Sequence, residues 1–146
     1  MQTRLIMGLA LAGGLALIGA WAWLSRPEGP DARPLVYVED PDEVGTLVAL
    51  RPPGIMTSEN FVGHRIRIVE GAIQNIGTET LGSVELLLTF RSVEGETVLE
   101  SREEGLPEPL APGEERRYVF RFENLPAEWD YRVPEVSVLR AGYESP

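Results

Sequence analysis

The side chains that could carry out catalysis are few, and their spacing matches no established catalytic set. His64 is the only histidine, and the chain contains neither cysteine nor lysine. These absences exclude a two-histidine metal site, a cysteine nucleophile and a lysine Schiff base. Neighbouring acids in the pairs Glu103-Glu104 and Glu114-Glu115 point to opposite sides of an extended chain, so neither pair offers convergent carboxylates. We therefore expect a protein that is not an enzyme and that carries no cofactor.

Two other segments are candidates for binding. Residues 39–43 (EDPDE) present hard carboxylate oxygens that suit calcium, but they lack the glycine and alternating ligands of an EF-hand loop. We interpret them as an acidic tether and keep calcium or small-ligand binding as an alternative. Trp129 and Tyr131 flank Asp130 and could form an exposed aromatic patch. Aromatic rings in loops more often anchor the loop to a core, and we expect that role here.

The charge distribution argues against nucleic acid as a partner. Residues 27–146 hold eleven arginines and all 23 acidic residues, which gives a formal net charge of −12. Binding to nucleic acid depends on cationic groups that displace counterions from phosphates. We therefore expect no binding to DNA, RNA or anionic headgroups.

An apolar N-terminal segment is the strongest local signal in the chain. Residues 5–24 contain no charge, and as a helix they would span about 30 Å, the thickness of a bilayer's hydrocarbon core. Trp21 and Trp23 would lie in the headgroup region, while Arg4 and Arg26 flank the segment. The sequence predicts one transmembrane helix acting as a signal anchor. The alternative is a signal peptide cleaved near residues 20–22 (AWA).

The same segment carries a stripe of small residues that could bring a second helix close. They recur every four positions, at Gly8, Ala12, Ala16 and Ala20. Such stripes mediate helix–helix association in membranes, although small residues are also simply common there. Because arginines lie near both ends of the helix, the positive-inside rule hardly distinguishes its two possible orientations in the membrane. The signal-like N-terminus favours a domain outside the cytoplasm.

Short alternating runs between turn signals predict an all-β domain after the anchor. We divide the chain into an N-terminal tail (1–4), the helix (5–24), a tether rich in proline and acids (25–45), a β-sandwich (46–143) and a C-terminal tail (144–146). The tether contains at most one short extended piece, at residues 35–38, and no helix of globular length is evident. The expected strands of the sandwich cover residues 46–50, 65–75, 84–90, 97–101, 117–123 and 134–140.

The clearest strand has Val84, Leu86, Leu88 and Phe90 on one face. A second has an inward face made of Tyr118, Phe120 and Phe122. In residues 65–75 the apolar positions change phase after Ile68, which indicates a bulge or a strand that moves between sheets. The expected core also includes Val136 and Val138.

Turn residues separate these strands. Gly95 closes a hairpin, and Pro112-Gly113 suits a tight turn. Asn75 followed by Gly77 can place a side-chain amide on turn backbone and supply a positive φ. Six or seven strands in about 100 residues, without crossover helices, predict an immunoglobulin-like antiparallel β-sandwich that lacks the cysteine pair.

The order of motifs resembles that of FxLYD-type bacterial β-sandwich modules. The resemblance is carried by residues 69–77 (VEGAIQNIG, with Gly71), 87–91 (LLTFR) with Gly95, 109–114 (PLAPGE) and 118–122 (YVFRF). Within that group the chain looks most like an uncharacterised family of single-helix-anchored proteins, with counterparts of residues 59–63 (ENFVG), 126–129 (PAEW) and Pro134. The chain departs from the signature at Phe90-Arg91, where an acid usually follows the aromatic residue.

The resemblance implies a fold and an anchored style of protein, without catalytic residues. We expect a single-pass protein of the bacterial inner membrane, with its domain on the periplasmic side. The leading hypothesis is a non-catalytic envelope protein whose sandwich binds a protein partner or acts as a scaffold. The alternative is an accessory subunit or assembly factor held in a larger membrane complex through its helix.

Overall fold

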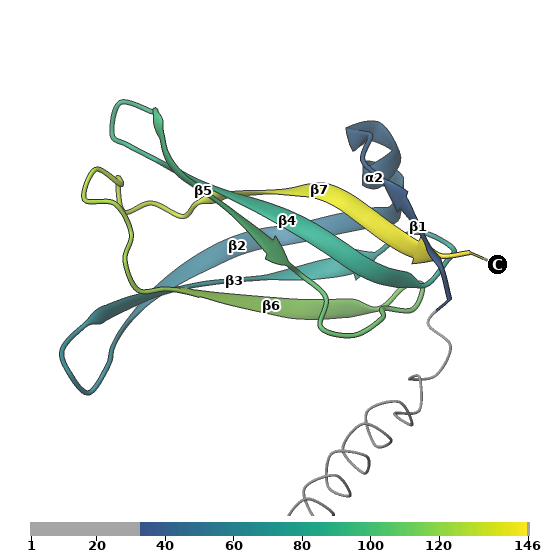
Figure 1. Ribbon diagram of the computed structural model, residues 1–146, viewed down its shortest axis with the longest axis horizontal. Helices are drawn as coiled ribbons and strands as arrows, with labels where there is room; N and C mark the ends of the chain where they lie inside the picture. Colours follow the sequence, from purple (N-terminus) through teal and green to yellow (C-terminus); the bar gives the residue numbers. More distant parts are fainter. Residues whose placement is uncertain (1–32, 146) are drawn as a thin grey trace, which may run out of the picture. The chain divides into compact units, whose positions relative to one another are not determined.

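The computed structural model describes residues 33–145, which form two antiparallel β-sheets and one short helix (Figure 1). The elements are β1 (Leu35–Val38), α2 (Pro41–Leu47), β2 (Val48–Glu59), β3 (Arg65–Asn75), β4 (Leu81–Arg91), β5 (Thr97–Glu104), β6 (Glu115–Phe122) and β7 (Glu135–Glu144). The prediction of an all-β sandwich is confirmed. The predicted membrane helix at residues 5–24 lies outside the described residues.

Each sheet combines strands from separate parts of the chain. The four-stranded sheet has the order β1-β7-β4-β5, and the three-stranded sheet has the order β2-β3-β6. All neighbouring strands are antiparallel. The chain therefore crosses from one sheet to the other four times, between β1 and β2, between β3 and β4, between β5 and β6, and between β6 and β7.

The core lies between the sheets and has the composition expected from the alternation. Val84, Leu86, Leu88 and Phe90 of β4 are all fully buried. Tyr118 of β6 is buried, and its neighbours on the same face and on β7 pack against the core: Phe120, Phe122, Val136 and Val138. From β3, Val69 and Ile73 complete the facing layer. Burying this apolar surface is the main contribution to the stability of the fold.

Strand β2 differs most from the expectation, because it does not end at Arg51-Pro52-Pro53-Gly54. The pairing advances three residues on β2, from Arg51 to Gly54, while it advances two on β3. The extra residue is a β-bulge, and β2 lies at a sheet edge, where the missing amide of proline is tolerated. The strand continues to Glu59.

The change of phase in residues 65–75 has a related explanation. Strand β3 pairs with β6 without a register shift from Arg67 to Gln74, so the bulge is in β2 and not in β3. Ile66 and Ile68 belong to the outer face, where Ile68 is paired with Met56. The residues that alternate with them share the inner face with Val69.

The segment predicted as a tether contributes structure to the domain from residue 35 onward. Strand β1 pairs with β7 along its length, from Leu35 opposite Glu144 to Val38 opposite Ala141. Helix α2 then occupies residues 41–47, and it includes the first two residues of the strand expected at 46–50. The side chain of Asp40 accepts hydrogen bonds from the amides of Asp42 and Glu43, at 3.0 and 3.2 Å. Two acids in the first turn and this N-cap favour a short helix whose single buried residue gives no periodic signal.

Within residues 33–145 no helix has the length and apolar character needed to cross a membrane. The same residues hold no cluster of three or more histidines and acids arranged to bind a metal ion.

Candidate functional site

Three connecting segments lie at one end of the sandwich, which we call the loop end (Figure 1). They are the β2–β3 turn (residues 60–64), the β4–β5 turn (92–96) and the β6–β7 loop (123–134). Ser92 forms an isolated β-bridge with Trp129, and the amide of Asp130 donates to the carbonyl of Arg91 at 2.9 Å. Strand β1 and the C-terminal end of β7 lie at the opposite end (Figure 1).

Trp129 anchors the β6–β7 loop to the core. Its side chain is 4% exposed and packs edge-on against Phe90, with ring centroids 5.8 Å apart. The Nε1 atom of the indole has no hydrogen-bond partner among the described residues. The ring of Tyr131 lies 5.1 Å from that of Trp129 but is 67% exposed. The expected anchoring role therefore applies to Trp129, whereas Tyr131 is available at the surface.

Tyr131 adopts an unusual backbone conformation. Its φ is +63°, and no other non-glycine residue of the described chain has a positive φ. The left-handed region costs an L-residue roughly 1–2 kcal/mol. The side chain of Asp130 supports the turn by accepting a hydrogen bond from the amide of Arg132 at 2.9 Å. The strained residue is therefore the one that presents its ring to solvent at the loop end.

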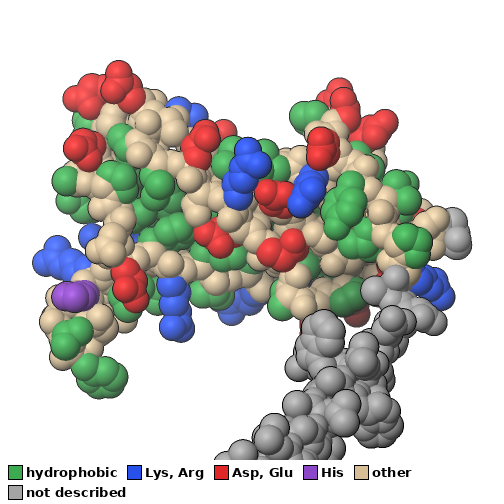
Figure 2. Space-filling view, in the orientation of Figure 1, with side chains coloured by type: hydrophobic (Ala, Val, Ile, Leu, Met, Phe, Trp, Pro, Cys, Tyr) green, Lys and Arg blue, Asp and Glu red, His purple; other side chains and the backbone are tan. Residues whose placement is uncertain are grey.

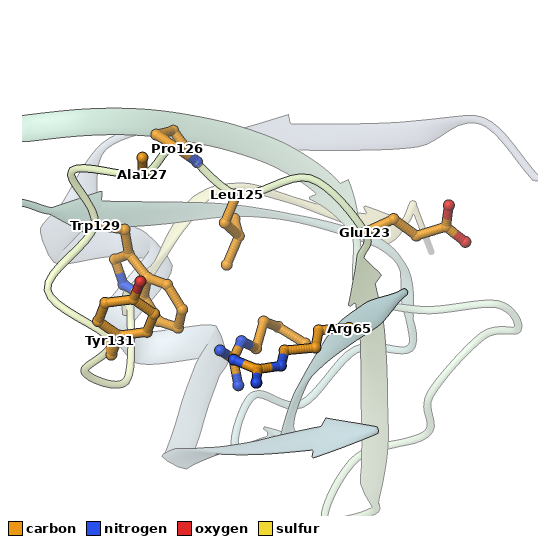
Figure 3. Close-up of a pocket in the computed structure, with 8 residues that line it drawn as sticks. Arg65, Glu123, Leu125, Pro126, Ala127, Trp129 and Tyr131 are labelled. Carbon is orange, nitrogen blue, oxygen red and sulfur yellow. The ribbon is translucent and has the colours of Figure 1, made fainter. Parts of the chain in front are cut away.

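A pocket of about 200 Å³ lies between this loop and the inner face of β3. We call it the arginine–aromatic pocket, and its lining residues are Arg65, Arg67, Glu123, Leu125, Pro126, Ala127, Trp129 and Tyr131. Figure 3 shows the guanidinium group of Arg65 directed toward the centre of the pocket and the carboxylate of Glu123 directed away from it. Leu125, Trp129 and Tyr131 form the opposite wall.

Arg67 is held in place by three contacts. Its guanidinium carbon lies 5.6 Å from the ring centroid of Trp129 and 5.7 Å from that of Tyr131. Its Nη1 atom donates a hydrogen bond to the hydroxyl of Thr57 on β2. Cation–π contacts of this kind are strongest where water is partly excluded, and Arg67 is half-buried. The guanidinium group is therefore positioned before any ligand arrives.

The hairpin beside the pocket exposes an apolar tip. Phe61 is fully exposed and Val62 is largely exposed. The side chain of Asn60 accepts hydrogen bonds from the amides of Val62 and His64 at 3.1 and 2.9 Å, which fixes the turn. Figure 2 shows apolar side chains at this tip next to the single histidine. Exposed apolar side chains on a fixed turn are typical of contact surfaces.

The motif residues singled out in the sequence lie elsewhere and maintain the fold. Asn75 is fully buried, and its amide group donates to the carbonyls of Glu79 and Leu110 at 2.8 and 2.9 Å. Its Oδ1 atom accepts from the amide of Gly77 at 3.0 Å. The positive φ expected at Gly77 is absent, and that residue instead lies close to Leu47, whose Cδ2 would be 3.0 Å from an added Cβ.

Two of the motif glycines, Gly95 and Gly113, do adopt the left-handed conformation, as does Gly63 in the β2–β3 turn. Gly95 has a φ of +87° in the β4–β5 turn, and Gly113 has a φ of +79° after Pro112. The amide of Glu114 donates to the carbonyl of Ala111 at 3.1 Å, which closes a turn with proline second and glycine third. These positions suit glycine because it alone has no Cβ.

Gly71 has a packing role. A Cβ at this position would overlap the hydroxyl group of Tyr118, which is buried and has no hydrogen-bond partner among the described residues. Burial raises the pKa of that hydroxyl above its ordinary value. Phe90 and Phe120 belong to the same aromatic layer, Phe90 against Phe122 at 5.0 Å and Phe120 stacked on Tyr118 at 5.1 Å.

The remaining sequence candidates do not converge on the pocket. Glu104 accepts hydrogen bonds from Ser83, Val84 and Leu106, so its carboxylate closes a loop. Asp40 caps α2 at the other end of the domain. The residues assigned to the membrane lie outside the described part of the chain: Arg4, Gly8, Ala12, Ala16, Ala20, Trp21, Trp23 and Arg26.

From the sequence, Trp129 and Tyr131 are candidates for an aromatic patch, whereas no motif in it predicts Arg65 and Arg67 as site residues. The signal that could have found them is their position on the strand. Val69 and Ile73 of β3 face the core, and the alternation of side chains places Arg65 and Arg67 on the same face. Ile66 and Ile68 obscured it, since they are apolar and occupy the outer face.

Comparison with known proteins adds no further constraint on the site, because no family model, curated protein or solved structure matches the chain.

Proposed function

We propose that this protein is a non-catalytic, membrane-anchored binding module whose loop end docks to a protein partner. The observation that carries the proposal is the convergence, at one end of the sandwich, of an exposed apolar hairpin tip and the arginine–aromatic pocket. Aromatic and arginine side chains are the types most enriched at the energetic centres of protein interfaces. Phe61, Tyr131 and Arg67 supply them here.

The chemistry of the described residues supports binding over catalysis. His64 lies at the exposed hairpin tip, and only its backbone bonds to Asn60: its amide donates to the Asn60 Oδ1 atom and its carbonyl accepts from the Asn60 amide. A general base needs a reacting group within hydrogen-bond reach and an orienting partner. Among residues 33–145, His64 has no nucleophilic side chain and no orienting side chain bonded to its imidazole ring.

The strand order supports the immunoglobulin-like assignment. In that fold strands A, B and E share one sheet, and strands C and F share the other. The order β2-β3-β6 corresponds to A-B-E, and the pair β7-β4 corresponds to F-C. Strand β1 then takes the place of strand G beside β7. The FxLYD-like motif order is compatible with this arrangement.

The apolar segment at residues 5–24 supports a single-pass anchor in a bacterial inner membrane, with the domain on the periplasmic side. The described chain begins at residue 33, at the end of the sandwich opposite the hairpin tip (Figure 1). The point at which the domain joins the preceding segment is therefore at the end of the sandwich away from the loop end. An anchor of this kind raises the local concentration of the module for partners at the same membrane.

Site-specific photocrosslinking in intact cells tests the proposal. The full-length chain carries benzoylphenylalanine either at Phe61 or, as a control, at Glu100 on the exposed outer face of β5. We expect one defined protein adduct from position 61 and none from position 100. Equal labelling at both positions would contradict docking at the loop end.

A second arm separates the module from a subunit held through its helix. Replacing residues 5–24 with an unrelated apolar helix removes the stripe at Gly8, Ala12, Ala16 and Ala20 but keeps the anchor. We expect the adduct at position 61 to persist. Its loss would favour an accessory subunit bound through the helix. Protease accessibility of the domain in spheroplasts checks the periplasmic orientation.

A further inference from the structure

The arginines of the described domain differ in whether they have an acidic partner. Seven of them form ion pairs: Arg33, Arg51, Arg91, Arg116, Arg117, Arg132 and Arg140. Four form none within residues 33–145, namely Arg65, Arg67, Arg102 and Arg121, although acids greatly outnumber arginines in this chain. Of these four, Arg65 and Arg67 line the same pocket.

Two acids beside the pocket, Glu59 and Glu123, form no ion pair with Arg65 or Arg67. Glu59 is opposite Arg65 in the register of β2 and β3, yet it forms no ion pair with it. Glu123 lines the pocket, but its carboxylate points away from the centre (Figure 3). The local charge at the bottom of the pocket is therefore positive within a strongly acidic domain, which attracts an anionic group to this position.

We infer that the arginine–aromatic pocket binds a carboxylate of the partner protein, either an acidic side chain or a chain terminus, and this inference rests on the proposed function. The planar fork of a guanidinium group matches a carboxylate, and charge-assisted hydrogen bonds strengthen where water is partly excluded. Arg67 is already fixed by Trp129, Tyr131 and Thr57, so little ordering is needed on binding.

The size and the walls of the pocket indicate how much of the partner enters. Its volume of about 200 Å³ is below the range of about 300–1,000 Å³ that is usual for small-molecule sites. Leu125, Pro126 and Tyr131 provide apolar contact above the arginines. One side chain or chain end fits such a site, with the neighbouring residues of the partner lying across Tyr131 and the hairpin tip.

Solution NMR on the full-length, ¹⁵N-labelled protein in detergent micelles tests this inference. The probes are N-acetyl-Leu-Glu-amide, N-acetyl-Leu-Leu with a free carboxylate, the neutral isostere N-acetyl-Leu-Gln-amide, and inorganic phosphate. We expect at least one carboxylate peptide to shift the Nε–Hε resonances of Arg65 and Arg67 in a saturable manner. The neutral peptide should bind at least about tenfold more weakly. The tighter of the two carboxylate peptides identifies the source as a side chain or a chain end.

Variants locate the binding. Arg65→Gln and Arg67→Gln should each weaken the carboxylate peptide by about tenfold or more. Arg121→Gln is the matched control, because Arg121 also forms no ion pair among the described residues but projects from the outer face. Thermal melts verify that each variant is folded. If Arg67→Gln destabilises the loop, the exposed Arg65 still provides the test.

Several results would overturn the inference. They are equal binding of the neutral peptide, tighter binding of phosphate than of both carboxylate peptides, no response to either carboxylate, and an equal loss in Arg121→Gln. Each of these leaves the crosslink at Phe61 intact if the proposed function holds. Loss of that crosslink with retained carboxylate binding would instead remove the proposed function.

Discussion

The buried amide of Asn75 joins three segments at the end of the domain away from the pocket, which makes Asn75→Ala an informative perturbation. The side chain is 0% exposed and makes three hydrogen bonds, to Glu79, Leu110 and Gly77. The backbone of the same residue bonds to Gly113 and Glu114. The alanine variant keeps the backbone bonds and removes all three side-chain bonds.

The expected loss of stability follows from these bonds. Each contributes about 0.5–1.5 kcal/mol net, and a buried group left without a partner costs more. The carbonyl of Leu110 still accepts from the amide of Leu81 at 3.0 Å, so it does not become an orphan. We therefore expect the free energy of unfolding to fall by about 3 kcal/mol, which corresponds to a decrease in Tm of roughly 10–20 °C for a domain of this size.

The assay is thermal and urea unfolding of the full-length protein in micelles, followed by the strand signal in circular dichroism. Asn124→Ala is the matched control, because Asn124 is exposed and makes no side-chain hydrogen bond within the described residues. Its effect should stay within about 0.5 kcal/mol. A change this small in Asn75→Ala, or an equal change in both variants, would refute the role assigned to the amide.

An Asn75→Asp variant separates lost hydrogen bonds from lost volume. Aspartate keeps the shape but directs a buried carboxylate at the carbonyls of Glu79 and Leu110. Its folded-state pKa should rise above the ordinary value of about 3.9, so the variant is most stable below that pH and loses stability as pH rises through the folded value. A destabilisation that does not depend on pH would contradict this account.

Further predictions concern Tyr118 and Gly113. Tyr118→Phe removes a buried hydroxyl without a partner and should raise the free energy of unfolding by about 1 kcal/mol, as measured by urea denaturation. Because burial raises the pKa of Tyr118 in the folded state, its contribution to stability is complete below the ordinary value of about 10 and is lost as pH rises from there to the folded value. The wild type should therefore lose more stability above pH 10 than Tyr118→Phe, and parallel pH profiles would contradict this reasoning. Gly113→Ala places a Cβ at a φ of +79° and should cost about 1–2 kcal/mol, whereas Gly54→Ala, which has open space and no positive φ, should cost less, as thermal melts would show.

The features that could be read from the sequence are those in which one local rule decides the outcome. The alternation in residues 84–90 identifies a buried face because each second residue of a strand points the same way. The Pro112-Gly113 turn follows because proline fixes the first central φ and glycine permits the positive φ at the second. Long-range context is not needed for either.

The features that could not be read depend on neighbours distant in sequence. Proline normally ends a central strand, because it has no amide to donate to the neighbouring strand. Pro52 and Pro53 are accommodated within β2 because that strand lies at a sheet edge and carries a bulge. Helix α2 has one buried residue, Val44, and therefore no periodic pattern. Its evidence is the capping by Asp40, which is a weak signal in a segment rich in acids.

The pocket also depends on residues distant in sequence, and its position follows from the course of β3. The inner face of β3 continues beyond the packed core toward the loop end, so Arg65 and Arg67 occupy positions that would hold apolar residues further along the strand. The chain has 23 acidic residues, and an acidic partner for either arginine would reduce the repulsion between the two guanidinium groups in one pocket. Without acidic partners, the two arginines contribute little to the stability of the fold. Arg67, held against Trp129 and Tyr131, is already positioned to contact an anionic group. This is the physical reason for placing the proposed binding activity at this end of the sandwich.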